Sequence, residues 1–349
     1  MKPSVSINIV TWNSMRFLPK LLNSISEQTF ENFSVLVIDN GSTDGVEAFV
    51  KTEYPNCKFL RNARNRGFSY AHNQGIRFVL DHCREESYND NFILITNPDV
   101  ILTPTFLEEL VSGIGIEKKI GSFGGKILRA FGSNQSDGVF DNTVRSDMID
   151  STGINAHKNM TFTDRGAGEL DEGQFNRNEQ VFGISGALVL YRASALHNAR
   201  YKDEFFDKDF FSYKEDVDLA WRLKTLGWNA MYNSNAVAYH FRGMFGKEKM
   251  SLFEKFLNRL KKSKVRSKYS TRNHLLLLIK NLRFTTFLLF APRIILNELL
   301  RFVYVLIFET KNIGAYIESI LLTPKIILKR MDLMKKKMIT IKDLHKWFI

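Results

Sequence analysis

Cysteine is scarce in this sequence, because only Cys57 and Cys83 occur among 349 residues. Two cysteines can build neither a disulfide framework nor the paired spacing of a zinc finger, so a disulfide-stapled scaffold and a zinc-finger module are excluded. We therefore expect a protein of a reducing compartment. Hydrophobic residues make up 44% of the chain, which is an ordinary share for a globular protein with a core of its own.

Several short motifs of large enzyme classes are missing as well. The sequence contains no Gly-x-Gly-x-x-Gly and no Gly-Lys-Ser/Thr loop, which disfavours a dinucleotide-dependent dehydrogenase and a P-loop enzyme. It also lacks a Gly-x-Ser-x-Gly elbow and any group of His and Cys at zinc spacing.

Long hydrophobic runs are absent too. The first 14 residues have one Lys and a short apolar stretch, which predicts a strand and not a secretory signal. Residues 272–308 are rich in Leu, Ile and Phe, but their charge-free stretches, 284–292 and 302–308, are short. A membrane-spanning helix needs about 20 consecutive apolar residues. A span is therefore not expected there.

Acidic residues are few at the C-terminal end. Residues 242–349 hold 24 Lys and Arg against 7 Asp and Glu, whereas the first 241 residues are slightly acidic. Between 327 and 338, apolar residues at a 4-3-4 spacing alternate with Lys and Arg, which is typical of a basic amphipathic helix in a membrane interface. Nucleic acid is disfavoured because the charge is interleaved with aliphatic side chains. A helical subdomain packed on the body or on a second copy stays open as the alternative.

What the sequence does contain, up to about residue 128, is an alternation of predicted strands and helices. Such alternation indicates an α/β fold with a mostly parallel sheet covered on both faces. The expected strands are 4–12, 33–40, 57–62, 91–96 and 120–128, and the expected helices are 16–28, 44–54, 69–83 and a helix that begins near 103.

The chain changes character after this region. Residues 130–180 are polar, Gly-rich and weakly periodic, which predicts irregular loops with short strands. We expect one domain over 1–241, with halves 1–128 and 129–241, and a basic helical region over 242–349 that associates with a membrane.

Two predicted strands end in an acid at a turn, in the stretches "VIDNGSTDG" (37–45) and "LITNPDV" (94–100). The carboxyl ends of parallel strands lie at one edge of a sheet, where open α/β sheets bind ligands. Asp39 and Asp99 are therefore predicted to lie on one polar cleft. The stretch 62–75 leads to the same edge, and Gly67 would allow close approach of the backbone.

Six short stretches of the chain, taken in their order along the sequence, resemble family 2 inverting glycosyltransferases of the GT-A fold. Their residues are most similar to those of the rhamnosyltransferase-like branch. Four resemble the family's nucleotide-sugar half and two its acceptor half. They are "SINIVTWNS", "VIDNGSTDG", "NRGFSYAHNQG" and "LITNPDV", followed by "SGALVLYR" and "FFSYKEDVDLAWRLKTLGW".

The resemblance implies a set of donor and metal residues. Asp39 matches the acid that contacts the nucleobase, and Asp99 the carboxylate that holds a divalent cation, Mg²⁺ or Mn²⁺, on the diphosphate. Where the family usually has Asp-x-Asp, this chain has Asn97-Pro98-Asp99, which leaves one carboxylate in place of two. His240 matches a position that can complete the metal or diphosphate site. The remaining positions that match donor-binding residues are Thr11, Asn13, Asn65, Gly67 and Asn97.

The resemblance also implies a base for the attacking hydroxyl, which an inverting reaction requires on the far face of the sugar. Asp216 matches this base, and Glu215 would contact the acceptor. As an aromatic residue on the same helix, Trp221 is predicted to stack on the acceptor sugar, with a place in the core as the open alternative. An alternative is that the acids near residue 215 only complement the dipole of a helix over 214–226. Asp218 and Arg222 are four residues apart on this helix and are predicted to form an ion pair.

We therefore expect a glycosyltransferase that moves a sugar, such as rhamnose or another deoxyhexose, from a dTDP- or UDP-linked donor to a lipid-linked or polysaccharide acceptor. The expected location is the cytoplasmic face of a bacterial inner membrane, and a homodimer is possible. The alternatives are a nucleotidyltransferase on a similar sheet and a non-catalytic binding protein. The sequence fixes neither the donor sugar nor the linkage.

Overall fold

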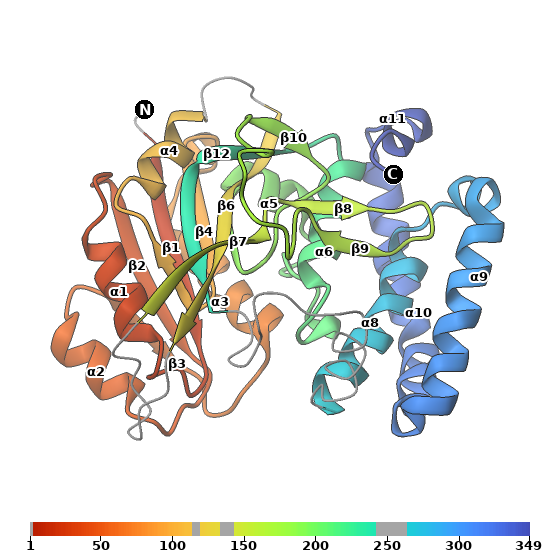
Figure 1. Ribbon diagram of the computed structural model, residues 1–349, viewed down its shortest axis with the longest axis horizontal. Coiled ribbons are helices and arrows are strands. Elements are labelled where there is room, and N and C mark those ends of the chain that lie inside the picture. The colour runs from red at the N-terminus through yellow and green to blue at the C-terminus, as the bar shows by residue number, and fades with distance from the viewer. Residues whose placement is uncertain (1–2, 114–118, 133–142, 242–263) are drawn as a thin grey trace.

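The computed structural model describes residues 3–113, 119–132, 143–241 and 264–349 (Figure 1). The strands are β1 (Ser4–Thr11), β2 (Phe33–Asp39), β3 (Lys58–Arg61), β4 (Asn91–Thr96), β5 (Val100–Leu102), β6 (Ile120–Gly132), β7 (Thr143–Ser151), β8 (Ile154–Ala156), β9 (Phe162–Asp164), β10 (Glu179–Val181), β11 (Leu188–Arg192) and β12 (Asn229–His240). The α-helices are α1 (Leu18–Ser26), α2 (Val46–Glu53), α3 (Phe68–His82), α4 (Phe106–Ser112), α5 (Ala193–Ala199), α6 (Glu215–Thr225), α8 (Lys264–Asn281), α9 (Phe284–Phe308), α10 (Ile313–Lys336) and α11 (Ile341–His345).

Most of these strands form one twisted sheet in the order β10-β12-β6-β11-β4-β1-β2-β3. β1, β2, β3 and β4 pair in parallel, and β6 pairs in parallel with β12. β11 is antiparallel to both β4 and β6, so β6 and β12 run in the same direction as β4. The carboxyl ends of β1, β2, β4 and β12 therefore lie at one edge of the sheet, which we call the carboxyl edge.

Helices cover both faces of the sheet. Along each central strand, apolar side chains point alternately into one or the other of two cores. Phe92 and Leu94 of β4 belong to a core with α1, α2 and α4. Ile93 and Ile95 face the other core, which contains α3, α5 and α6. This confirms the predicted α/β fold with a mostly parallel sheet covered on both faces. The strands and helices predicted before residue 128 agree with the observed ones to within a few residues.

The segment predicted to be irregular, 130–180, has more order than expected where it is described. β6 continues to Gly132 and pairs with the nine-residue β7. β8 and β9 then form a separate antiparallel pair. The short β5 was not predicted, and it matters because its antiparallel pairing with β12 sets Val100 opposite His240.

The C-terminal helices pack against the second half of the body, to the right of the sheet in Figure 1. A core of aromatic and aliphatic side chains joins Leu276 and Leu277 of α8, Phe290 of α9 and Ile326 of α10 to Trp221 of α6. The expected helical tail is thus present, and residues 242–263 of the predicted membrane-associating region lie outside the described residues. Among the helices in the described ranges, none is long and apolar enough to cross a membrane.

Candidate active site

A cavity of about 880 Å³ lies where the carboxyl edge meets α6 and the C-terminal helices. Its polar wall brings together five predicted site residues from three separate stretches of the sequence. They are Asn97, Asp99, Glu215, Asp216 and His240.

The carboxyl edge brings Asp39 against the end of β1, as the parallel register Thr11–Asp39 requires. Thr11 Oγ1 donates a hydrogen bond to Asp39 Oδ1 at 3.0 Å, and the backbone N–H of Ser42 donates to Asp39 Oδ2 at 2.9 Å. Asp39 and Thr11 have no exposed surface, and neither lines the cavity. In this structure they hold the turn after β2, and their contact with a donor stays a prediction.

Asn13, Asn65 and Gly67 shape the loops next to this turn. The Oδ1 of Asn13, an exposed residue, accepts a hydrogen bond from the backbone N–H of Thr43 at 2.9 Å. Asn65 Oδ1 accepts from the N–H of Gly67 at 2.8 Å, which fixes the entry to α3. Gly67 has φ +81°, and a Cβ there would lie 2.6 Å from Phe211, so only glycine fits between α3 and the loop before α6.

Asp99 meets His240 because β5 carries the chain antiparallel along β12. The Nε2 of His240 lies 3.2 Å from Asp99 Oδ1, and Nδ1 of the same ring lies 2.9 Å from Asp150 Oδ2. Burial lowers the pKa of His240, but the two carboxylates more than offset this effect and raise the pKa to about 10. The ring is therefore held between two acids, one of which lines the cavity.

The donor set fits a divalent cation in part. Asp99 Oδ1 is buried and lies 3.2 Å from His240 Nε2. His240 is oriented by Asp150 on Nδ1, as metal-ligating imidazoles usually are. With its raised pKa the ring is an imidazolium, so it would bind an ion only after losing the Nε2 proton. Within the described residues no group of three His, Cys, Asp or Glu surrounds one point. The protein would thus supply one or two ligands, as is common for Mg²⁺ bound with phosphate oxygens and water.

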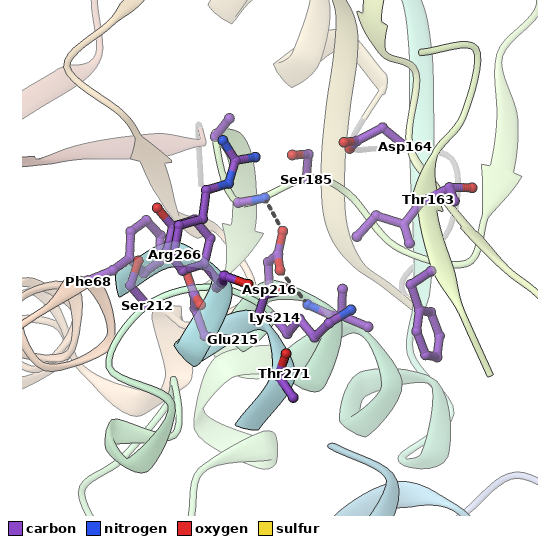
Figure 2. A pocket seen from close by; sticks show the side chains of 18 of the residues that line it. Phe68, Thr163, Asp164, Ser185, Ser212, Lys214, Glu215, Asp216, Arg266 and Thr271 are labelled. Carbon is purple, nitrogen blue, oxygen red and sulfur yellow. Dashed lines mark hydrogen bonds between the residues drawn. The ribbon is translucent and has the colours of Figure 1, made fainter. Parts of the chain in front are cut away.

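Asp216 lies in the first turn of α6 and faces the cavity (Figure 2). Its Oδ2 accepts from the backbone N–H of Gly186 at 2.9 Å, and its Oδ1 accepts from the N–H of Val217 at 2.8 Å. Burial raises the pKa of Asp216 above its usual range, although the two N–H donors act in the opposite direction. The carboxylate is thus held in one orientation and is more basic than an exposed aspartate.

Glu215 lies beside Asp216 and is more deeply buried. Its Oε2 has no hydrogen-bond partner, although the residue lines the cavity. Burial, and then the charge of Asp216, raise the pKa of Glu215 well above its usual range. A neutral carboxyl group at this point can donate a hydrogen bond to a hydroxyl in the cavity, which fits the predicted contact with an acceptor.

The backbone just before α6 has positive φ angles, which residues other than glycine seldom adopt. Phe211, Tyr213 and Lys214 have φ values of 63°, 73° and 68°. Asn273 of α8 holds this turn, because its Nδ2 lies within hydrogen-bond distance of the carbonyl oxygens of Phe210, Ser212 and Tyr213, at 2.8 to 2.9 Å. Asn273 was not predicted as a site residue, since nothing in its local sequence signals a contact 60 residues away.

The predicted ion pair of Asp218 and Arg222 is confirmed, with Arg222 Nε 2.8 Å from Asp218 Oδ2. Lys280 of α8 also reaches this carboxylate at 2.9 Å and bridges it to Asp207 at 2.7 Å. Lys329 of α10 adds contacts to Asp207, Asp209 and Glu204. The tail is therefore ionically bound to the segment that precedes the catalytic candidate.

The prediction for Trp221 requires correction. Its side chain has no exposed surface and does not line the cavity. The ring packs 5.4 Å from Phe162 and 5.6 Å from Phe348, centroid to centroid, inside the core that joins body and tail. Trp221 is therefore a core residue, which is the alternative that the sequence left open.

Comparison with known proteins agrees with this geometry. Residues 6–199, more than half of the chain, match the family described as glycosyl transferase family 2. A protein of Mycobacterium tuberculosis named N-acetylglucosaminyl-diphospho-decaprenol L-rhamnosyltransferase is 29% identical over 236 residues, which cover 67% of this chain and 74% of that protein. Glycosyltransferase AglE of Haloferax volcanii is 35% identical over 79 residues, 21% of this chain and 26% of that one.

Two solved structures are among those to which the chain shows some similarity. The S. aureus TarS structure, residues 1–349, is 17% identical with a TM-score of 0.47, covering 80% of this chain and 66% of that one. The mannosyltransferase PcManGT from Pyrobaculum calidifontis, solved with GDP-Man and Mn²⁺, is 14% identical with a TM-score of 0.48, covering 93% of this chain and 76% of that one.

Proposed function

Since the chain belongs to glycosyl transferase family 2, in its rhamnosyltransferase-like branch, we propose that it transfers rhamnose or another deoxyhexose to an acceptor. The donor in this proposal is a dTDP- or UDP-linked sugar. The acceptor is a hydroxyl group of a lipid-linked glycan, and the transfer inverts the anomeric configuration. Family membership favours this function over nucleotidyl transfer and over a non-catalytic binding role.

The observation that carries the proposal is the meeting of two groups in one cavity. Asn97, Asp99 and His240 lie at the carboxyl edge, and Glu215 and Asp216 lie at the start of α6. The first group suits a nucleoside diphosphate and the second an attacking hydroxyl. A donor bound between them would have its leaving group and its nucleophile on opposite sides, which inversion requires.

Asp216 is the base in this proposal. It removes the proton of the acceptor hydroxyl as the hydroxyl attacks the anomeric carbon, and the bond from that carbon to the diphosphate breaks. The N–H groups of Gly186 and Val217 keep the carboxylate in place, and Glu215 orients the acceptor from the side. A positioned base of this kind contributes about 10²–10⁴-fold to a rate.

A divalent cation would be held by Asp99, with His240 as the second candidate ligand. Such an ion, when bound, neutralises the charge that develops on the departing diphosphate. Asn97 stands where the family usually has the first acid of the pair. Its amide group would face the diphosphate without the negative charge that an acid would add.

We propose that the protein lies on the cytoplasmic face of a bacterial inner membrane, attached by its tail. The described residues of the tail, 264–349, hold 17 Lys and Arg against 5 Asp and Glu. Each basic residue near an anionic membrane surface contributes about 1 kcal/mol to binding.

The proposed base leads to a defined pH dependence. The transfer rate is expected to fall on the acid side as Asp216 becomes protonated, at a pH above the usual aspartate pKa of about 3.9, because the folded protein raises the pKa of this group. The charge of Asp164 also raises the pKa of Asp216. The substitution Asp164→Asn removes this charge, so it should move the acid limb of the kcat/KM profile to lower pH. An unchanged limb in this variant would argue against Asp216 as the titrating group.

The donor is tested by thermal-shift titration of the purified protein with dTDP, UDP, GDP and CDP and their sugars, and with ATP, with and without Mn²⁺. A ligand at about 100 times its dissociation constant stabilises a protein by roughly 2.7 kcal/mol. We expect a selective, metal-dependent response to dTDP or UDP compounds. Asp99→Asn should lose the metal-dependent part of the response, whereas Asp81→Asn, an exposed position on α3, should keep it.

The other outcomes are equally informative. A response to ATP or CDP compounds alone would support nucleotidyl transfer. Absence of any nucleotide response would contradict the proposed function, and a product with retained anomeric configuration by NMR would contradict inversion.

A further inference from the structure

The outer face of α9 is apolar and unusually exposed for a protein in water. Between residues 294 and 308 every exposed side chain is apolar, although Glu298 and Arg301 lie half-buried on the other side of the helix. α9 lies at the right-hand edge of the molecule in Figure 1, on the side away from the sheet. A contiguous apolar surface of this kind marks an interaction site. The exposed side chains are Ile295, Leu296, Leu299, Leu300, Phe302, Val303, Leu306, Ile307 and Phe308.

The cavity opens onto this face. Leu300 lines the cavity and yet is 61% exposed, so it belongs to both surfaces. Arg301, Tyr304 and Val305 of the same helix line the cavity from the inner side. A molecule that lies along the outer face of α9 can therefore reach the cavity without crossing the body of the protein.

The tail also brings cationic side chains into the cavity. Arg266 of α8 and Arg301 of α9 both line it. In the view of Figure 2, Arg266 lies on the same side of Asp216 as Phe68 and Ser212, away from Thr163 and Asp164. Guanidinium groups bind phosphate oxygens in a bidentate manner, so the tail wall of the cavity suits an anion of the phosphate type.

We propose that the tail wall of the cavity binds the diphosphate of a lipid-linked acceptor, with Arg266 and Arg301 on the diphosphate and the outer face of α9 in the lipid. The inference rests on the proposed function and adds the place and chemistry of the acceptor site. The membrane presents the acceptor from the α9 side, and the sugar that the diphosphate carries then extends toward Glu215 and Asp216.

Charge argues for lipid as the occupant of the α9 face in preference to a second copy of the chain. The described tail, 264–349, holds 17 Lys and Arg against 5 Asp and Glu, and Arg293 is exposed on α9 itself, so two such tails placed face to face would bring like charges together. An anionic membrane surface complements these cations while its hydrocarbon accepts the apolar side chains.

The diphosphate subsite is tested with farnesyl diphosphate as the probe, by isothermal titration of the full chain. We expect farnesyl diphosphate to bind more tightly than inorganic diphosphate or farnesol. Arg266→Ala and Arg301→Ala should each weaken its binding by about tenfold, the usual magnitude for a lost hydrogen bond to a charged group, whereas Arg→Lys at either position should restore part of it. The thermal shift with dTDP or UDP should be unchanged in all four variants.

If inorganic diphosphate binds as tightly as farnesyl diphosphate, and the Ala variants weaken dTDP or UDP binding equally, the arginines serve the donor and the proposal is wrong. Loss of nucleotide binding in the wild type, with farnesyl diphosphate still bound, would instead contradict the proposed function and leave this subsite in place.

The α9 face is tested by co-sedimentation with vesicles of phosphatidylglycerol and phosphatidylcholine. The double substitution Leu299→Glu and Val303→Glu should abolish most of the binding. Leu170→Glu, at an exposed apolar position on the body, should leave it unchanged. If the wild type is a dimer in solution, and the double variant is a monomer that still binds vesicles, the occupant is a second copy and the proposal is overturned.

Discussion

Asp216→Asn is expected to lower kcat for sugar transfer by about 10²–10⁴-fold, with donor binding and folding unchanged. Asparagine has nearly the shape of aspartate, and its Oδ1 can still accept a hydrogen bond from Gly186 or Val217. It cannot take a proton from the attacking hydroxyl at neutral pH, so the loss falls on the chemical step and not on the KM for the donor.

Two companion variants make this result specific. Asp203→Asn, at a carboxylate that is 60% exposed and pairs with Arg77, should keep the full rate. Glu215→Gln should mainly raise the KM for the acceptor, because its proposed role is to orient that molecule. Steady-state kinetics with separate variation of donor and acceptor distinguishes the two effects. If Asp216→Asn kept the full rate and Glu215→Gln lost most of its kcat, Glu215 and not Asp216 would be the base.

Lys280→Met is expected to lower the free energy of unfolding by about 3–5 kcal/mol, the usual cost of breaking a buried ion pair. The ammonium group of Lys280 bridges Asp207 and Asp218, and all three side chains are at most 3% exposed. Methionine keeps the volume of the side chain but leaves two buried carboxylates with one cation fewer. Lys329 and Arg222 remain as their other partners, so the protein should still fold.

The pH dependence of this loss has a definite sign. Burial alone would raise the pKa values of Asp207 and Asp218, but Lys280 together with Lys329 or Arg222 more than offsets this and holds both pKa values below their usual range. Their contribution to stability is therefore fully present above the unfolded aspartate pKa of about 3.9 and is lost as the pH falls below it. The difference between wild type and Lys280→Met should be largest at neutral pH and shrink in acid.

Chemical denaturation at several pH values measures both effects. The matched control is Lys346→Met, which removes an exposed pair with Asp343 and should leave the free energy of unfolding almost unchanged. If the two substitutions cost the same, the buried network does not stabilise the contact between tail and body. Because this network holds the segment before α6, we also expect Lys280→Met to lower the transfer rate at temperatures where the variant is still folded.

Much of the fold and part of the candidate site followed from local patterns in the sequence. The period-two and period-3.6 spacing of apolar residues predicted the strands and helices of the first half, because these spacings decide which side chains are buried. The position of Asp99 followed from the end of a strand, whereas Asp216 was singled out by the resemblance of its stretch to the family's acceptor half. Both residues line one cavity in the structure.

The sequence by itself therefore determined the α/β class, the polar carboxyl edge and the acids that we propose for the chemistry. Only the tertiary structure decided which residues meet. It placed Trp221 in the core, paired His240 with Asp99 through the unpredicted β5, and showed that the tail forms one wall of the cavity. The physical reason is distance along the chain. Periodicity encodes local conformation and the face that is buried, whereas the partner of Lys280, 62 residues away at Asp218, is chosen by packing.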